Sequence, residues 1–175
     1  MTGPDPFDLE ALPGDSDLDV DDTTTGYARP IHVRWRYLGL VAVGGTAGTA
    51  IREGLSLTFP PTAGPAWIIV VINVVGAFAL GVLLESLARR GPDEGRRRTL
   101  RLLLGTGLLG GFTTYSSLAT ATALLLKSGQ PGLAIVYALA TVLLGAAGSI
   151  AGIAVASARH RRRINRQSGP VEAIR

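Results

Sequence analysis

The segment GLLGGFTTYSS, residues 107–117, places glycines and hydroxyl side chains inside one of the most apolar stretches of the chain. Glycine removes side-chain bulk and loosens a helix, and Ser and Thr hydroxyls satisfy backbone groups that a break leaves unpaired. A helix interrupted at mid-membrane exposes carbonyl oxygens, which are hard ligands for a cation such as Na⁺. We therefore expect this helix to be broken mid-membrane. The residues that favour the break are Gly105, Gly107, Gly110, Gly111, Thr113, Thr114, Ser116 and Ser117.

Other polar side chains in apolar surroundings are candidates for contact with an ion, because polar groups at membrane depth are costly and usually face a bundle interior or a water path. Asn73 can donate and accept, so it suits either a partly dehydrated ion or an interhelical hydrogen bond. Tyr137 and Thr141 lie one helical turn apart, although a Thr in such a helix most often bonds its own backbone. Arg52 either snorkels as an interfacial pair with Glu53 or lines a vestibule.

The composition indicates an integral membrane protein that is not an enzyme. The chain has 175 residues, 47% of them hydrophobic, with 23 glycines and a mean hydropathy of +0.33, which is too apolar for a soluble domain of this size. Cysteine is absent, so there is neither a disulfide framework nor a thiolate metal site. No Ser/His/Asp spacing or phosphate loop occurs, and His32 and His160 both lie outside the apolar stretches.

Four apolar blocks reach the length of about 20 residues that a helix needs to cross a bilayer. They cover residues 37–57, 66–88, 100–126 and 132–157, and the breaks between them are rich in Pro, Gly and polar residues. Because unpaired backbone groups are not tolerated in lipid, each block should be helical. The predicted fold is all-α, with four transmembrane helices.

The positions of the basic residues predict the topology. They cluster before the first block, between the second and third, and after the fourth, whereas the two opposite loops contain only Lys127. Basic flanks stay on the cytoplasmic side, so both termini should be cytoplasmic and the protein should lie in the cell inner membrane. The flanking residues are Arg29, Arg34, Arg36, Arg89, Arg90, Arg96, Arg97, Arg98, Arg101, Arg159, Arg161, Arg162, Arg163 and Arg166.

Two charged tails flank the predicted membrane domain of residues 31–160. Residues 1–30 are acidic and rich in Pro, Gly, Asp and Thr, which predicts a disordered cytoplasmic tail. Residues 161–175 form a basic cytoplasmic tail. Its run RHRRRINR directly follows a span, so topology and attraction to anionic membrane lipid explain it better than binding to nucleic acid.

The chain resembles the Fluc/CrcB family of fluoride channels over nearly all of residues 37–157. GGTAGTAIRE is like the first-span signature of that family, INVVGAFALG like the second, and GLLGGFTTYSS like the third. The third is the most specific, because it combines GG, a spacer and TT at fixed spacing. The resemblance implies an antiparallel dimer of four-helix subunits, with two fluoride pores along the interface and one structural Na⁺ at the dimer centre. Its task would be passive export of F⁻, which relieves fluoride toxicity.

The resemblance also assigns roles to single residues. The backbone carbonyls of Gly110 and Thr113 from both subunits would hold the Na⁺, and Arg52 would match the arginine near the vestibule. Asn73 would correspond to the pore asparagine of the second span. The full set of pore-lining residues implied in this way is Asn73, Tyr115, Ser116, Ser117, Leu118, Tyr137 and Thr141.

Two features depart from the family pattern. Where the family commonly has FSTF, this chain has Tyr115, Ser116, Ser117 and Leu118, so one of two ring edges that can meet an anion is missing. The basic flanks favour one orientation, whereas balanced flanks let a single polypeptide insert both ways. A homodimer and a heterodimer with an oppositely oriented homologue are therefore both open.

Two other functions compete with a conducting subunit. The replacement at Leu118 suggests an accessory half-channel, in which the partner supplies the working pore. A small proton-coupled multidrug exporter also uses four short helices in an antiparallel dimer. That class needs a carboxylate deep in the first span, whereas Glu53 lies near a span end.

Overall fold

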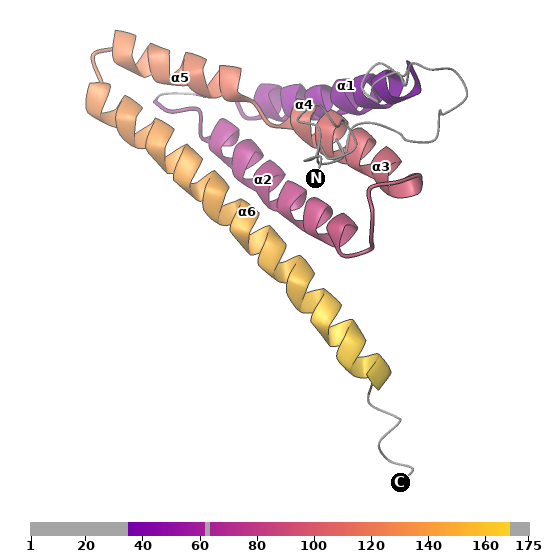
Figure 1. Cartoon of the computed structure of the whole chain (residues 1–175). Coiled ribbons are helices and arrows are strands. Elements are labelled where there is room, and N and C mark those ends of the chain that lie inside the picture. The colour runs from indigo at the N-terminus through magenta and orange to yellow at the C-terminus, as the bar shows by residue number, and fades with distance from the viewer. Residues whose placement is uncertain (1–34, 62–63, 169–175) are drawn as a thin grey trace, which may run out of the picture. The chain divides into compact units, whose positions relative to one another are not determined.

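The computed structural model describes residues 35–61 and 64–168, and every regular element in these two ranges is helical (Figure 1). The prediction of an all-α chain is confirmed for this part. The chain divides into two units, Met1–Gly39 and Leu40–Arg175. The contacts described below lie within the second unit. The predicted acidic tail, residues 1–30, and residues 169–175 fall outside the described ranges.

The helices correspond in position to the four apolar blocks. The third block is divided into several elements, of which α3, η3 and α4 follow one another without a gap, and two residues separate α4 from α5. The elements in chain order are α1 (Trp35–Thr58), α2 (Trp67–Ala88), α3 (Arg96–Leu100), the π-helix η3 (Arg101–Leu109), α4 (Gly110–Phe112), α5 (Tyr115–Lys127) and α6 (Pro131–Ser168).

Two of the described helices are long and apolar enough to cross a membrane. They are α2 and the Pro131–Ile164 part of α6, whose apolar 18-residue windows have mean hydropathies of 2.6 and 2.1. The α1 helix has 24 residues but contains Arg52 and Glu53. The third block is divided into shorter pieces, of which α5 has 13 residues.

The last helix is longer than its apolar block. The predicted span ends at residue 157, whereas α6 continues to Ser168 and includes the first residues of the predicted basic tail. Ala and Arg are good helix formers, and neither Gly nor Pro occurs between residue 153 and Ser168, so nothing in the sequence ends the helix at the end of the apolar block.

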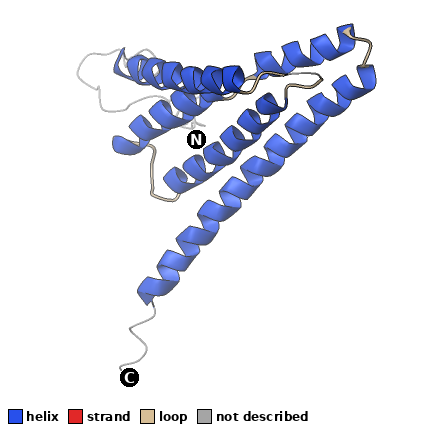
Figure 2. Ribbon diagram, turned by 180° about the vertical axis from the view of Figure 1, so that it is seen from behind, coloured by secondary structure: helices blue, strands red, loops and turns tan. Residues whose placement is uncertain are grey.

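Small residues allow α2 and α6 to pack side by side (Figures 1 and 2). A Cβ added at Gly152 would overlap the carbonyl oxygen of Phe78, and one added at Gly81 would overlap that of Ser149. Close approach through small residues is the usual packing mode of membrane helices. At one end of this pair, α5 contributes to a buried cluster of Val70, Leu118, Leu125, Ala134 and Tyr137.

Glycine also sets the packing of α1 against η3 and α4. A Cβ at Gly44 would overlap the Leu103 carbonyl oxygen, and one at Gly48 would overlap that of Leu108. From the opposite side, a Cβ at Gly111 would overlap the Gly45 carbonyl oxygen. The glycines of the first apolar block therefore allow close approach of α1 to these helices.

The wide turns of η3 precede the predicted break. At its end the backbone N–H of Gly110 donates to the carbonyl of Gly105, five residues earlier, which is the π-helical pattern. π-Helical turns are rare in proteins overall, and those that occur are often found at functional sites. Gly105 and Gly107 are both buried, and a Cβ at Gly107 would lie 3.0 Å from Gly44 Cα, so glycine at 107 permits the close approach of α1.

Candidate functional site

The helical backbone stops at Phe112 and resumes at Tyr115. The two residues between are extended: Thr113 has φ −77° and ψ 156°, and Thr114 has φ −149° and ψ 119°. The helical conformation is therefore lost just after the glycine pair, and Gly110 and Gly111 themselves remain helical. The N–H of Thr113 still donates to the Leu109 carbonyl at 3.0 Å, whereas the peptide groups of the extended Thr114 have left the helical pattern and need other partners.

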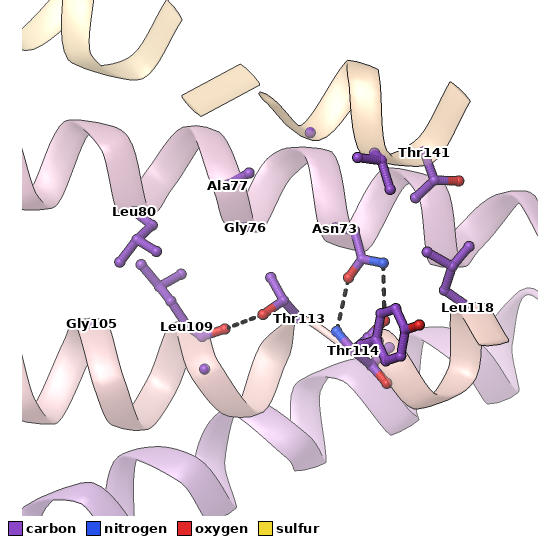
Figure 3. A pocket seen from close by; sticks show the side chains of 14 residues that line it. Asn73, Gly76, Ala77, Leu80, Gly105, Leu109, Thr113, Thr114, Leu118 and Thr141 are labelled. Carbon is purple, nitrogen blue, oxygen red and sulfur yellow. Dashed lines mark hydrogen bonds between the residues drawn. The ribbon is translucent and has the colours of Figure 1, made fainter. Parts of the chain in front are cut away.

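The side chain of Asn73, on α2, supplies two of those partners (Figure 3). Its Nδ2 donates to the Thr114 carbonyl at 3.0 Å, and its Oδ1 accepts from the Thr114 N–H at 2.8 Å. An amide carries two N–H hydrogens, and this pairing uses one of them. Among the described residues, the second has no protein acceptor, so it can donate to a ligand.

The side chain of Thr114 begins α5. Its Oγ1 accepts from the Ser117 N–H at 3.1 Å, as a helix cap does, and its own hydroxyl donates to Ser117 Oγ at 3.0 Å. The Ser116 Oγ lies 3.1 Å from Thr114 Oγ1. Because Ser117 Oγ accepts here, its own hydrogen is left for another partner.

These side-chain bonds release two carbonyl groups. In a continuous helix the N–H of Thr114 would donate to Gly110, and that of Ser117 would donate to Thr113. Here those N–H groups donate to Asn73 and to Thr114 Oγ1 instead. The carbonyls of Gly110 and Thr113 thus lose these helical partners, and they are the two that the family resemblance implies as cation ligands.

The neighbouring carbonyl of Gly111 is occupied by α1. Thr49 Oγ1 and Arg52 Nε each donate to it at 3.4 Å. Arg52 also lies 3.7 Å from Glu53 and is half-buried. Arg52 therefore contacts the residues before the break through its guanidinium, whereas its predicted vestibule role stays a prediction.

A groove of about 340 Å³ lies beside the break (Figure 3). Its walls come from α2, η3, α4, the two residues of the break, α5 and α6. None of its lining residues, all within the described part of the chain, carries a carboxylate. A neutral lining of amide, hydroxyl and aliphatic groups does not repel an anion. The predicted site residues that line the groove are Asn73, Gly110, Thr113, Tyr115, Leu118 and Thr141.

The ring of Tyr115 and the side chain of Leu118 lie in opposite environments. Tyr115 is 82% exposed, whereas Leu118 is 6% exposed and belongs to the buried cluster of α2, α5 and α6. The side chain of Leu118 thus contributes both to a groove wall and to the core. The aromatic edge is available only at Tyr115 of this pair.

Tyr137 is buried and does not line the groove. Its hydroxyl donates to the Ala66 carbonyl at 3.1 Å, and its ring meets Trp67 edge to face at 6.3 Å. The hydroxyl of Thr141 donates to the Tyr137 carbonyl at 2.7 Å, as is usual for Thr in a membrane helix. Thr141 consequently presents oxygen lone pairs, not a hydrogen, to any ion in the groove.

The sequence predicts that the Thr114 hydroxyl satisfies a backbone group at the break, which the structure confirms, but the role of Thr114 as the cap of α5 was missed. A detectable signal existed, since a Thr followed three residues later by a polar residue and then by an apolar run is typical of a helix start. Gly76 was also missed: a Cβ there would overlap Thr113 Cγ2, so this position keeps α2 close to the break.

The known proteins that this chain resembles share one description. Residues 39–153 match the family described as CrcB-like protein, Camphor Resistance (CrcB). "Fluoride-specific ion channel FluC 2" of Leifsonia xyli subsp. xyli is 54% identical over 77% of this chain and 92% of its own length. "Fluoride-specific ion channel FluC 1" of Cutibacterium acnes is 46% identical over 70% of this chain and 85% of its own.

A more distant relative shares the same description. "Fluoride-specific ion channel FluC" of Thermus thermophilus is 41% identical over 63% of this chain and 86% of its own length. The matched residues include α2, the break and most of α6. None of these names favours an exporter or an enzyme. With these matches added to its apolar helices, this chain belongs to the CrcB family of membrane proteins.

Proposed function

We propose that the chain is a subunit of a fluoride-specific channel, which lets F⁻ leave the cell passively and relieves fluoride toxicity. The names of relatives up to 54% identical support this function. The observation that carries the proposal in the structure is the neutral groove at the helix break, with the Asn73 amide beside it. Fluoride is strongly hydrated, so a narrow pore must replace its water with hydrogen-bond donors.

The path proposed for F⁻ follows the hydrogen-bond donors that have no protein acceptor among the described residues. They are the second N–H of Asn73, the hydroxyl of Ser117 and, at the exposed edge, the hydroxyl and ring of Tyr115. Ser116 contacts Thr114 Oγ1 next to them, Leu118 contributes to the apolar side of the groove, and Thr141 presents only oxygen lone pairs to it. Tyr137 would act indirectly, because its hydrogen bond to Ala66 fixes the N-terminal end of α2.

The released carbonyls fit a structural Na⁺. Alkali cations prefer uncharged oxygen ligands, and Gly110 and Thr113 each offer a carbonyl without its helical partner. We assign these two groups, from two subunits, as the residues that would hold the ion at the centre of an antiparallel dimer. When bound, Na⁺ would supply positive charge that braces the interface.

The proposed topology has four spans in the cell inner membrane with both termini in the cytoplasm. The support is the charge asymmetry of the loops. One preferred orientation favours a heterodimer with an oppositely inserted homologue over a homodimer. An accessory half-channel is the second candidate, favoured by the aliphatic, buried Leu118.

Fluoride efflux from liposomes tests the proposal. The full chain is reconstituted alone and together with a homologue of opposite flanking charge, and efflux of F⁻ is compared with that of Cl⁻. We expect F⁻ efflux with the pair and none for Cl⁻. Efflux by the chain alone would reject the need for a heterodimer, whereas no selective F⁻ efflux in either sample would reject the channel assignment.

A further inference from the structure

A second groove, of about 780 Å³, lies where α2 ends beside the basic part of α6. Figure 2 shows α6 running on past the end of α2. The groove is far from neutral, because most of its lining residues are basic. They are Ser86, Arg89, Arg90, Ala156, Arg159, His160, Arg162, Arg163 and Ile164.

One arginine of this groove is fixed by the protein. Arg89 donates from Nε to Glu85 Oε1 at 2.5 Å and from a terminal nitrogen to Ser157 Oγ at 2.9 Å. Ser157 in turn donates to the same Glu85 oxygen at 2.7 Å. This network ties α2 to α6 and commits the nearest carboxylate to Arg89.

The remaining arginines of the groove have no carboxylate partner within the part of the chain that the structure describes. There, Glu53 pairs with Arg52, Glu85 with Arg89, and Asp93 with Arg101. No described carboxylate pairs with the other four arginines of the groove, which are Arg90, Arg159, Arg162 and Arg163. Like charges held together at this density favour binding of an anion that neutralises them.

Apolar side chains lie among these charges. Ala156 and Ile164 are separated by two helical turns of α6, so they share a face, and Ile164 is 48% exposed. The helix segment passes directly from an apolar span into this basic stretch, which sets the groove at the boundary between hydrocarbon and water. An aliphatic floor with a cationic rim fits a molecule that has both an acyl chain and a phosphate.

We propose that this groove binds the headgroup phosphate of an anionic membrane phospholipid, with its first acyl carbons against Ala156 and Ile164. Arg159 and Arg163, one turn apart, supply planar donors that match phosphate oxygens. Arg90 adds charge from α2, so the bound lipid bridges the two helices. A free phosphate would use the arginines but gain nothing from the aliphatic floor.

Lipid binding to the full-length protein in detergent tests this site, with phosphatidylglycerol as the probe and phosphatidylcholine as the neutral reference. The groove variant is Arg159→Gln with Arg163→Gln. The matched control is Arg96→Gln with Arg161→Gln, which removes the same charge from exposed arginines outside the groove. An arginine near an anionic surface contributes about fivefold in affinity, so diffuse attraction lowers both variants alike.

We expect the groove variant to lose at least roughly tenfold more phosphatidylglycerol affinity than the control variant. A charge-preserving pair, Arg159→Lys with Arg163→Lys, should recover most of that loss and shows that the site is folded. Equal losses in the two Gln variants, or no recovery with Lys, would overturn the site. Displacement of the lipid by inorganic phosphate or by a short RNA at the same concentration would overturn the lipid as its occupant.

Discussion

At the scale of single residues, the side chain of Asn73 replaces hydrogen bonds that a continuous helix would make. It pairs with both backbone groups of Thr114 and keeps one donor for another partner. A single amide thus couples the local backbone of the break to the chemistry of the groove. The two roles that a buried Asn can have in a membrane helix, contact with an ion and an interhelical hydrogen bond, are therefore compatible at this position.

Replacing Asn73 should separate these two roles. Asn73→Leu leaves both Thr114 groups unpaired, at a cost of about 1–3 kcal/mol for each, and should depress fluoride efflux. Asn73→Asp keeps the acceptor but loses the donor and adds negative charge, so it should depress efflux with a smaller loss of thermal stability. Val75→Ala, at an exposed position of the same helix, is the control. Unchanged efflux in both Asn73 variants would contradict the pore assignment.

Tyr115 and Leu118 should respond differently to truncation. Tyr115 is 82% exposed, so Tyr115→Ala should change the free energy of unfolding by less than about 0.5 kcal/mol and still lower fluoride efflux. Leu118→Ala removes a buried side chain and should cost about 2–5 kcal/mol. Tyr115→Phe separates the ring from the hydroxyl. Thermal unfolding and liposome efflux, measured on the same samples, distinguish these effects. Normal efflux with Tyr115→Ala would show that this ring does not line the fluoride path.

At the scale of elements, the break depends on how closely three helices approach it. Gly48 and Gly111 bring α1 against η3 and α4, Gly76 brings α2 against Thr113, and Arg52 contacts the Gly111 carbonyl. These helices cannot easily slide along one another, because each glycine directly faces a carbonyl or a side chain of the neighbouring helix. The two extended residues are therefore held from both sides.

A pair of alanine substitutions in α1 tests this packing. At Gly48 an added Cβ would overlap the Leu108 carbonyl, so Gly48→Ala should destabilise the fold by about 1–3 kcal/mol. At Gly54 an added Cβ meets nothing within 4 Å, so Gly54→Ala should be neutral or stabilise the helix by up to about 1 kcal/mol. Thermal unfolding in detergent measures both. Similar melting temperatures for the two variants would show that α1 does not pack as described.

At the scale of the whole molecule, the family match and the charged ends occupy different parts of the chain. The match covers residues 39–153, whereas the acidic segment precedes it and the basic end of α6 follows it. Ion conduction should then depend on the matched part, and the basic end serves contact with lipid. The neutral groove, which lies beside the break, and the basic groove lie at separate places along α2 and α6.

Removal of residues 1–29 should leave fluoride efflux within about twofold of the full chain, because all groups assigned to the path lie beyond residue 39. A longer truncation that removes residues 1–48 deletes Gly44 and Gly48 and should abolish efflux. Both truncations are compared in the same liposome measurement. A large loss on removing residues 1–29 would mean that the acidic segment takes part in transport.

Much of this protein can be predicted from its sequence, since hydropathy and helix breakers act locally. They predict an all-helical chain, the positions of the four helical regions and an unusual third region, and motif spacing indicates the family. The family resemblance also implies Gly110 and Thr113 as cation ligands, but spacing alone cannot tell which carbonyls are released. That depends on Asn73 and Thr114, whose bonds join residues 41 apart and three apart.

Only the tertiary structure decides which polar groups remain available. The hydroxyl of Thr141 is committed to its own helix, Tyr137 is buried against Ala66, and Ser117 keeps a hydrogen. The same holds for the basic run, which the sequence predicts as a tail and the structure extends as a helix beside α2. Local sequence determines where helices can form, whereas the competition of each donor and acceptor for partners is settled only when distant segments meet.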